Sequence, residues 1–183
     1  MADTGTTRLI GIAIPTLREL RGATLASLSA TPSGEADAVD ALREAGYAGG
    51  DAVYEAFESW LRELHSSAAP DLTLDEFGER AAEYFRAAGW GDVEFDSRHE
   101  DGIATLTIGD CWEGSPADAE VAPSCHVTTG MLAAFFGRLA GYPVSVLETE
   151  CCSTGAERCS FMLGNSDVMT FKWEQLRYEE EPA

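Results

Sequence analysis

Four of the five cysteines of this chain lie between positions 125 and 159, in the stretch CHVTTGMLAAFFGRLAGYPVSVLETECCSTGAERC. The first cysteine precedes an apolar segment that is typical of a buried helix, and the other three follow or lie close to a β-rich segment. Thiolates are preferred zinc ligands, and structural zinc sites fill four positions with Cys, His or a carboxylate. We therefore interpret the stretch as the core of a metal-clamped binding domain.

Four residues are the candidate metal ligands: Cys125, Glu148, Cys151 and Cys159. Glu148 and Cys151 fall on or at the end of a predicted strand, and Cys159 falls on the next. A hairpin brings its stems within about 5 Å, so these three can converge. Cys125 would add the fourth ligand from just before the apolar helix. Four protein ligands leave no open position, so such a zinc would have a structural role.

The spacing by itself leaves alternatives open. Small buried cysteines are common core residues, and zinc-finger CxxC pairs are absent. Cys152 and His126 each adjoin a proposed ligand and could replace it. Neighbours on a strand point to opposite faces, so only one of Cys151 and Cys152 can face the site. Thiol catalysis by Cys111 or Cys152 has no evident base beside it except His126.

The charge balance of the chain argues against one class of function, the binding of nucleic acids. The chain has 32 Asp and Glu against 12 Lys and Arg, a net charge of -20. Such a chain lacks the clustered cations that phosphate contacts need, which excludes nucleic-acid binding. An acidic surface suits a high-salt cytoplasm or simple solubility. With no leader and no apolar run of transmembrane length, we expect a soluble cytoplasmic protein with free thiols.

We expect a flexible N-terminus over 1–8 and one domain over 9–183, helical over 9–90. The pattern predicts a helix over 10–28 with one buried face. A second helix should begin after Ser33 and end at Gly46, and a third should occupy 51–65 with His65 at its end. Thr73 opens a capping box for a helix that runs to about residue 88.

The part from 91 to 183 should hold the sheet, the metal site and a pocket. Residues 92–97 and 102–110 alternate as two antiparallel strands, joined by a polar turn that contains His99. Then follow a loop over 111–124, an all-round apolar helix and the β-hairpin described above. The tail should begin as a strand and end as a helix.

A cysteine before a glycine-containing apolar helix, then V-x-E-x-x-C, a turn and C-x-F, resembles the 4-vinyl reductase domain. That family is similar to the sensory domains of phenol- and xylene-responsive activators, and distantly to TRAPP-type subunits. The resemblance implies a zinc site on Cys125, Glu148, Cys151 and Cys159, and so decides against Cys152 and His126. It also implies an α+β fold, with an antiparallel sheet packed against N-terminal helices and one buried apolar helix, and a homodimer.

The resemblance further implies a buried pocket for an aromatic or lipophilic small molecule, with Trp112, Phe135 and Val146 as lining residues. The main hypothesis is thus a stand-alone sensory domain without catalytic residues. Alternatives are a tetrapyrrole carrier of (bacterio)chlorophyll biosynthesis and a TRAPP-like scaffold subunit without ligand. A reductase is disfavoured because the chain has no G-x-G-x-x-G motif after a strand.

Overall fold

The computed structural model describes residues 11–30, 34–97, 102–117, 119–120 and 122–180. The expected flexible segment 1–8, Ser33 and the predicted turn residue His99 lie outside the described residues. The elements run in the order α1 (Ile14–Ser29), α2 (Gly34–His65), η1 (Ala69–Asp71), α3 (Leu74–Ala87), β1 (Asp92–Asp96), β2 (Ala104–Gly109), α4 (His126–Ala140), β3 (Ser145–Glu150), η2 (Cys152–Thr154), β4 (Cys159–Gly164) and α5 (Ser166–Glu180).

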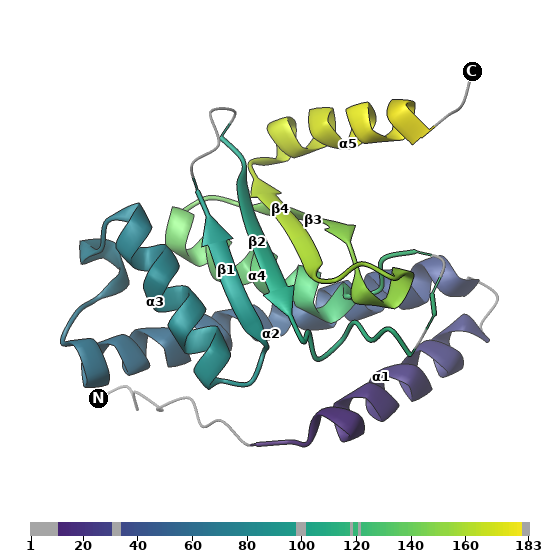
Figure 1. The fold of residues 1–183 in the computed structure, drawn as a ribbon, viewed down its shortest axis with the longest axis horizontal. Helices are drawn as coiled ribbons and strands as arrows, with labels where there is room; N and C mark the ends of the chain where they lie inside the picture. Colours follow the sequence, from purple (N-terminus) through teal and green to yellow (C-terminus); the bar gives the residue numbers. More distant parts are fainter. Residues whose placement is uncertain (1–10, 31–33, 98–101, 118, 121, 181–183) are drawn as a thin grey trace.

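The four strands form one antiparallel sheet in the order β1-β2-β4-β3. Both predicted strand pairs are present, β1 with β2 and β3 with β4. The sheet joins them through β2 and β4, where Ile108 pairs with Cys159. Helices α4 and α2 lie behind the sheet in Figure 1, and α3 lies against the β1 edge. This arrangement confirms the predicted α+β fold.

Helix α2 corrects the predicted break at Gly46. It runs without interruption through Gly46 and Gly50, which line its contact with α4. A Cβ on Gly46 would overlap the Val127 carbonyl oxygen, and one on Gly130 would overlap that of Arg43. The glycines therefore serve close approach of two helix backbones and do not end a helix. The sequence alone does not distinguish these two roles, because glycine suits both of them.

The two other long helices of the core follow the prediction. Thr73 caps α3: its hydroxyl accepts from the Glu76 amide, and the Glu76 carboxylate accepts from the Thr73 amide. Helix α4 is buried on most sides, as its apolar residues predicted. Phe135 on α4 is fully buried in an aromatic cluster with Tyr54, Phe57, Phe77, Phe85 and Phe136.

The two terminal helices differ from the predictions. Helix α1 buries no residue completely, and Leu20 on it is 58% exposed. The tail contains no strand as far as residue 180: α5 begins at Ser166, one residue after β4, and the Asn165 side chain accepts from the Val168 amide there. An Asx cap of this kind starts a helix at once. None of the helices in the described part of the chain is long and apolar enough to cross a bilayer.

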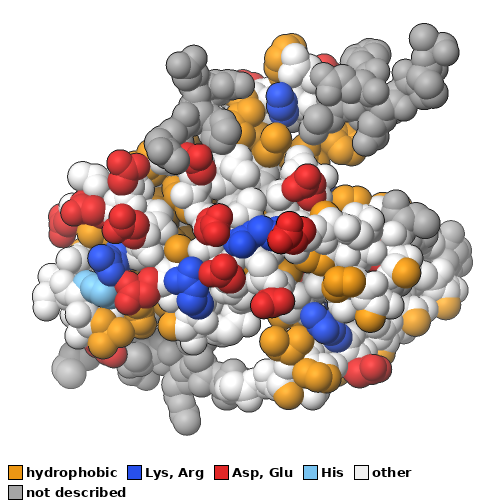
Figure 2. Space-filling view, in the orientation of Figure 1, with side chains coloured by type: hydrophobic (Ala, Val, Ile, Leu, Met, Phe, Trp, Pro, Cys, Tyr) orange, Lys and Arg blue, Asp and Glu red, His pale blue; other side chains and the backbone are white. Residues whose placement is uncertain are grey.

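Charged side chains gather over the outer face of the sheet in Figure 2. Arg86 and Arg158 pair with Asp92 of β1, and Arg158 also lies near Glu94 of the same strand. The outer face is thus polar, and the buried chemistry of the chain lies on the opposite, helix-covered side.

Candidate metal centre

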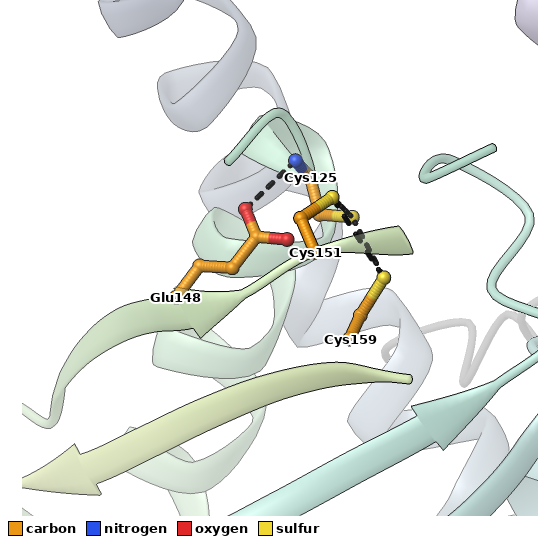
Figure 3. A group of neighbouring side chains, drawn as sticks. All are labelled: Cys125, Glu148, Cys151 and Cys159. Carbon is orange, nitrogen blue, oxygen red and sulfur yellow. Dashed lines mark hydrogen bonds between the residues drawn. The ribbon is translucent and has the colours of Figure 1, made fainter. Parts of the chain in front are cut away.

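Three structural elements bring four donor side chains together. Cys125 is the N-cap residue of α4, Glu148 lies on β3, Cys151 follows the end of that strand, and Cys159 begins β4. One ligand atom from each lies within 4.8 Å of every other (Figure 3). The three cysteines are fully buried. All five cysteines of the chain are free thiols, so no disulfide competes for these sulfurs.

The three sulfur atoms form a nearly equilateral triangle. The Sγ–Sγ distances are 3.7 Å for Cys125–Cys151, 3.6 Å for Cys125–Cys159 and 3.8 Å for Cys151–Cys159. A tetrahedral zinc with Zn–S bonds of about 2.3 Å requires edges of about 3.8 Å. The spacing of the thiols therefore matches one face of a zinc–thiolate tetrahedron.

Glu148 has one carboxylate oxygen engaged and one unsatisfied. Its Oε2 accepts a hydrogen bond of 2.9 Å from the Cys125 amide. Its Oε1 is buried and has no hydrogen-bond partner in the described structure, and the second oxygen in Figure 3 points toward the sulfurs. Burial raises the pKa of Glu148 to about 9. A cation among the sulfurs would satisfy this oxygen and offset the cost of burying its charge.

The thiols influence one another strongly. The hydrogen bond with Cys125 lowers the pKa of both Cys111 and Cys151, while the contact with Cys111 raises the pKa of Cys125 and Cys159. Metal ligation requires thiolates, so a cation bound here would displace the thiol protons to solvent. The donor set and its spacing therefore fit a structural zinc ion.

Two residues that were not predicted as part of the metal site complete the surroundings of the triangle. Gly114 faces the sulfurs so closely that an added Cβ would meet all three of them. Cys111 is buried with its sulfur 3.8 Å from that of Cys125. Both belong to the loop between β2 and α4, and no spacing rule connects them to the hairpin cysteines. Only the path of this loop in the fold reveals them.

The same loop carries a second carboxylate, which was also missed. Glu113 is fully buried and accepts hydrogen bonds from the amides of Val127 and Thr128 at 2.9 and 2.8 Å. Its Oε1 pairs with Arg21 of α1 at 3.1 Å, and Arg21 also donates to the Ser124 carbonyl. Burial raises the pKa of Glu113. Glu113 and Glu148 together satisfy the first amides of α4, whose N-terminus favours negative charge.

The two competing ligand candidates lie outside the four-residue group. The Cys152 thiol donates to the Glu157 carbonyl oxygen at 3.5 Å. His126 is the first residue of α4, and burial lowers its pKa to about 4. Neither belongs to the set whose ligand atoms lie within 4.8 Å of one another.

The three predicted pocket residues do not line one common cavity in the described pockets. Trp112 is 8% exposed and contacts Trp90 edge to face, and its indole Nε1 is buried without an acceptor. Phe135 lies in the aromatic core, and Val146 packs against the core and pairs with Leu163 across β3 and β4.

An apolar pocket of about 230 Å³ lies near the C-terminal end of α4. Phe136, Leu139, Phe95, Val144 and Leu163 are among its lining residues. It adjoins two of the predicted residues: the Phe135 and Phe136 ring centroids are 5.3 Å apart, and Val146 neighbours Leu163. Phe135 and Val146 thus lie next to residues that line the pocket and are not among its lining residues themselves.

Comparison with known proteins places these observations in context. Residues 105–165 match the family model of the 4-vinyl reductase domain. Across the solved structures, the phenol-responsive sensory domain of the transcription activator PoxR with phenol is 18% identical, with a TM-score of 0.66. The similarity covers 96% of this chain and 85% of that one. No curated protein matches the chain.

Two further solved structures match the chain with different TM-scores. A trafficking protein particle complex subunit 3 from Naegleria fowleri, covalently bound to palmitic acid, is 11% identical with a TM-score of 0.62, over 82% of this chain and 93% of that one. A vinyl-4-reductase family protein from Methanocaldococcus jannaschii is 16% identical with a TM-score of 0.49, over 86% and 84%. The family match covers β2, α4, β3 and β4 but not β1, and the resemblance to the 4-vinyl reductase domain that the sequence predicted is confirmed over residues 105–165.

Proposed function

We propose that this chain is a small-molecule-binding sensory domain of the 4-vinyl reductase type, in which a structural zinc ion holds α4 to the β3–β4 hairpin. Cys125, Glu148, Cys151 and Cys159 are the proposed ligands. The observation that carries the metal proposal is the sulfur triangle, whose edges of 3.6 to 3.8 Å suit tetrahedral zinc. A homodimer and the absence of catalysis belong to the same proposal.

The proposed ligand is a small aromatic or lipophilic molecule. In support, the fold is similar to that of a phenol-responsive sensory domain over 96% of the chain. The pocket beside α4 measures about 230 Å³. Drug-sized ligands usually occupy about 300–1,000 Å³. A compact ligand of one or two rings therefore suits this volume better than a long acyl chain such as palmitate.

Trp112, Phe135 and Val146 remain the proposed ligand contacts. The free indole N–H of Trp112 supports a ligand that carries a hydrogen-bond acceptor, because a buried donor without a partner costs about 1–3 kcal/mol. Phe135 and Val146 adjoin the pocket lining and would contact a molecule that entered from there.

Metal analysis of protein purified without chelator tests the zinc proposal. We expect about one zinc per chain. Cys159→Ser should lose the metal and roughly several kcal/mol of unfolding free energy, because metal binding is coupled to folding. The control is Cys152→Ser, which removes a buried thiol outside the proposed ligand set. Metal-free wild type, or equal zinc retention by both variants, contradicts the proposal.

Thermal shift measurements with phenol, larger aromatic compounds and palmitate test the ligand proposal. Phenol-type compounds should raise the melting temperature of wild type. Trp112→Phe keeps a ring but removes the N–H, and Leu139→Trp fills the pocket; both should reduce the shift. Trp173→Phe, at a residue that is 48% exposed, is the matched control. Stabilisation by palmitate alone would favour a carrier of acyl chains, and no stabilisation by any compound would favour a scaffold subunit.

A further inference from the structure

The buried thiol of Cys111 lies beside the candidate metal centre as a fifth donor. Its sulfur is 3.8 Å from that of Cys125, the same distance that separates Cys151 from Cys159 within the triangle. The Cys111 side chain is 1% exposed and belongs to the buried core. Its sulfur lies at the distance from the Cys125 sulfur that two ligands of one tetrahedral metal require.

Cys111 and Glu148 both adjoin Cys125. The Glu148 carboxylate accepts a hydrogen bond from the Cys125 amide, and the Cys111 sulfur lies 3.8 Å from the Cys125 sulfur. A tetrahedral cation bound by the three shared sulfurs has one position left, and either neighbour can supply the fourth atom. One is a hard carboxylate oxygen and the other a soft thiolate sulfur, and cations differ in which of these they prefer.

The chain from Cys111 to Glu113 is held in place. Arg18 of α1 donates to the carbonyl oxygens of Cys111 and Trp112, at 3.3 and 2.7 Å. Glu113, two residues further on, is fixed by the α4 amides and by Arg21. With the backbone fixed, rotation of the Cys111 side chain is the movement that would bring the sulfur into or out of the coordination sphere.

We propose that Cys111 is an alternate fourth ligand, so that the centre binds zinc through three thiolates and Glu148 but binds a softer cation such as cadmium through four thiolates. This inference rests on the metal site of the proposed function and assigns a metal-specificity role to Cys111. Each thiol that coordinates the cation gives up its proton to solvent, so the cadmium complex forms with one further thiol proton released.

Cadmium and zinc titrations of the metal-free, reduced full chain test the assignment. Sulfur-to-cadmium charge-transfer absorbance grows with the number of bound thiolates. Cys111→Ser should lower it by about a quarter, since one of four sulfur bonds is lost. X-ray absorption spectroscopy of the zinc complex should count three sulfurs and one oxygen in both wild type and Cys111→Ser. This zinc complex also shows that the variant folds. Cys152→Ser should leave both complexes unchanged.

The outcomes separate this inference from the proposed function. If neither cation binds wild type at one per chain, the metal site itself fails. If cadmium binds but Cys111→Ser keeps the wild-type absorbance, the metal site stands and the role of Cys111 is refuted. Loss of a sulfur from the zinc complex of Cys111→Ser also overturns the proposal, because Cys111 would then be a permanent ligand in place of Glu148.

Discussion

Gly114→Ala should disable the metal centre without touching any of its ligands. An alanine Cβ at this position would lie 2.8 Å from the sulfur of Cys159, 3.0 Å from that of Cys151 and 3.1 Å from that of Cys125. It would thus sit near the axis of the sulfur triangle, about 2 Å from its plane. A tetrahedral cation with bonds of about 2.3 Å lies on the same axis, about 0.9 Å from the plane. On either side of the plane, the methyl group would come within about 3 Å of the cation.

The crowding at Gly114 sets the size of the expected losses in stability and in zinc affinity. The backbone at Gly114 is not in the left-handed region, so alanine is allowed there and would ordinarily stabilise by about 0.4–1 kcal/mol. Overpacking a buried site instead costs about 1–3 kcal/mol. We therefore expect the metal-free variant to lose about 1–2 kcal/mol. Displacement of the sulfurs should weaken zinc binding at least about tenfold, which is a further 1.4 kcal/mol.

Competition with a chromophoric zinc chelator measures the affinity, and urea unfolding with and without zinc measures the stability. Gly49→Ala is the control, because nothing lies within 4 Å of a Cβ at that position of α2. It should keep wild-type zinc affinity and gain a fraction of a kcal/mol from helix propensity. If Gly114→Ala binds zinc as tightly as wild type and unfolds at the same urea concentration, the described geometry of the sulfur triangle is wrong.

Two further predictions concern groups outside the proposed ligand set. Glu113→Gln and Arg21→Met should each destabilise, the first by about 2–4 kcal/mol because it leaves Arg21 without its buried charge partner. The double variant should lose at least about 1 kcal/mol less unfolding free energy than the two single variants lose together. If the losses measured by urea unfolding are additive, Glu113 and Arg21 are not coupled. Burial raises the pKa of Tyr84 from 10.0 to about 12. The folded state therefore keeps a proton that the unfolded state loses, so stability should fall as pH rises through this window. The free energy of unfolding of Tyr84→Phe, measured by urea unfolding at pH 9 to 12, should fall less steeply with pH than that of wild type. An unchanged slope would refute the raised pKa of Tyr84.

Much of the secondary structure could be predicted because its signals are local. The Thr73 capping box, the two strand pairs and the all-round apolar α4 each depend on residues close in sequence. The predicted helix end at Gly46 was wrong because glycine has two different roles in helices. It ends a helix where the chain needs a left-handed residue, and it continues one where another backbone approaches. The approach of Val127 decides between them.

The residues of the candidate site could likewise be predicted only in part. Glu148, Cys151 and Cys159 lie on one hairpin, and Cys125 precedes the apolar helix before it, so residue type and spacing suggested all four; the resemblance to a known family decided against His126 and Cys152. Cys111, Glu113 and Gly114 carried no such signal, because a loop between β2 and α4 has no periodicity. Their proximity to the sulfurs depends on how α1 and α4 hold that loop.

The amino-acid sequence by itself determined the acidic charge balance of this protein, the alternation of its strands and the supply of thiols for a soft cation. These properties follow from charge, period and residue type, which need no coordinates. Only the tertiary structure decided which thiols meet, at what spacing, and that a second carboxylate and a fifth donor lie beside them. Distances between segments far apart in the chain depend on packing, and packing is a property of the whole fold.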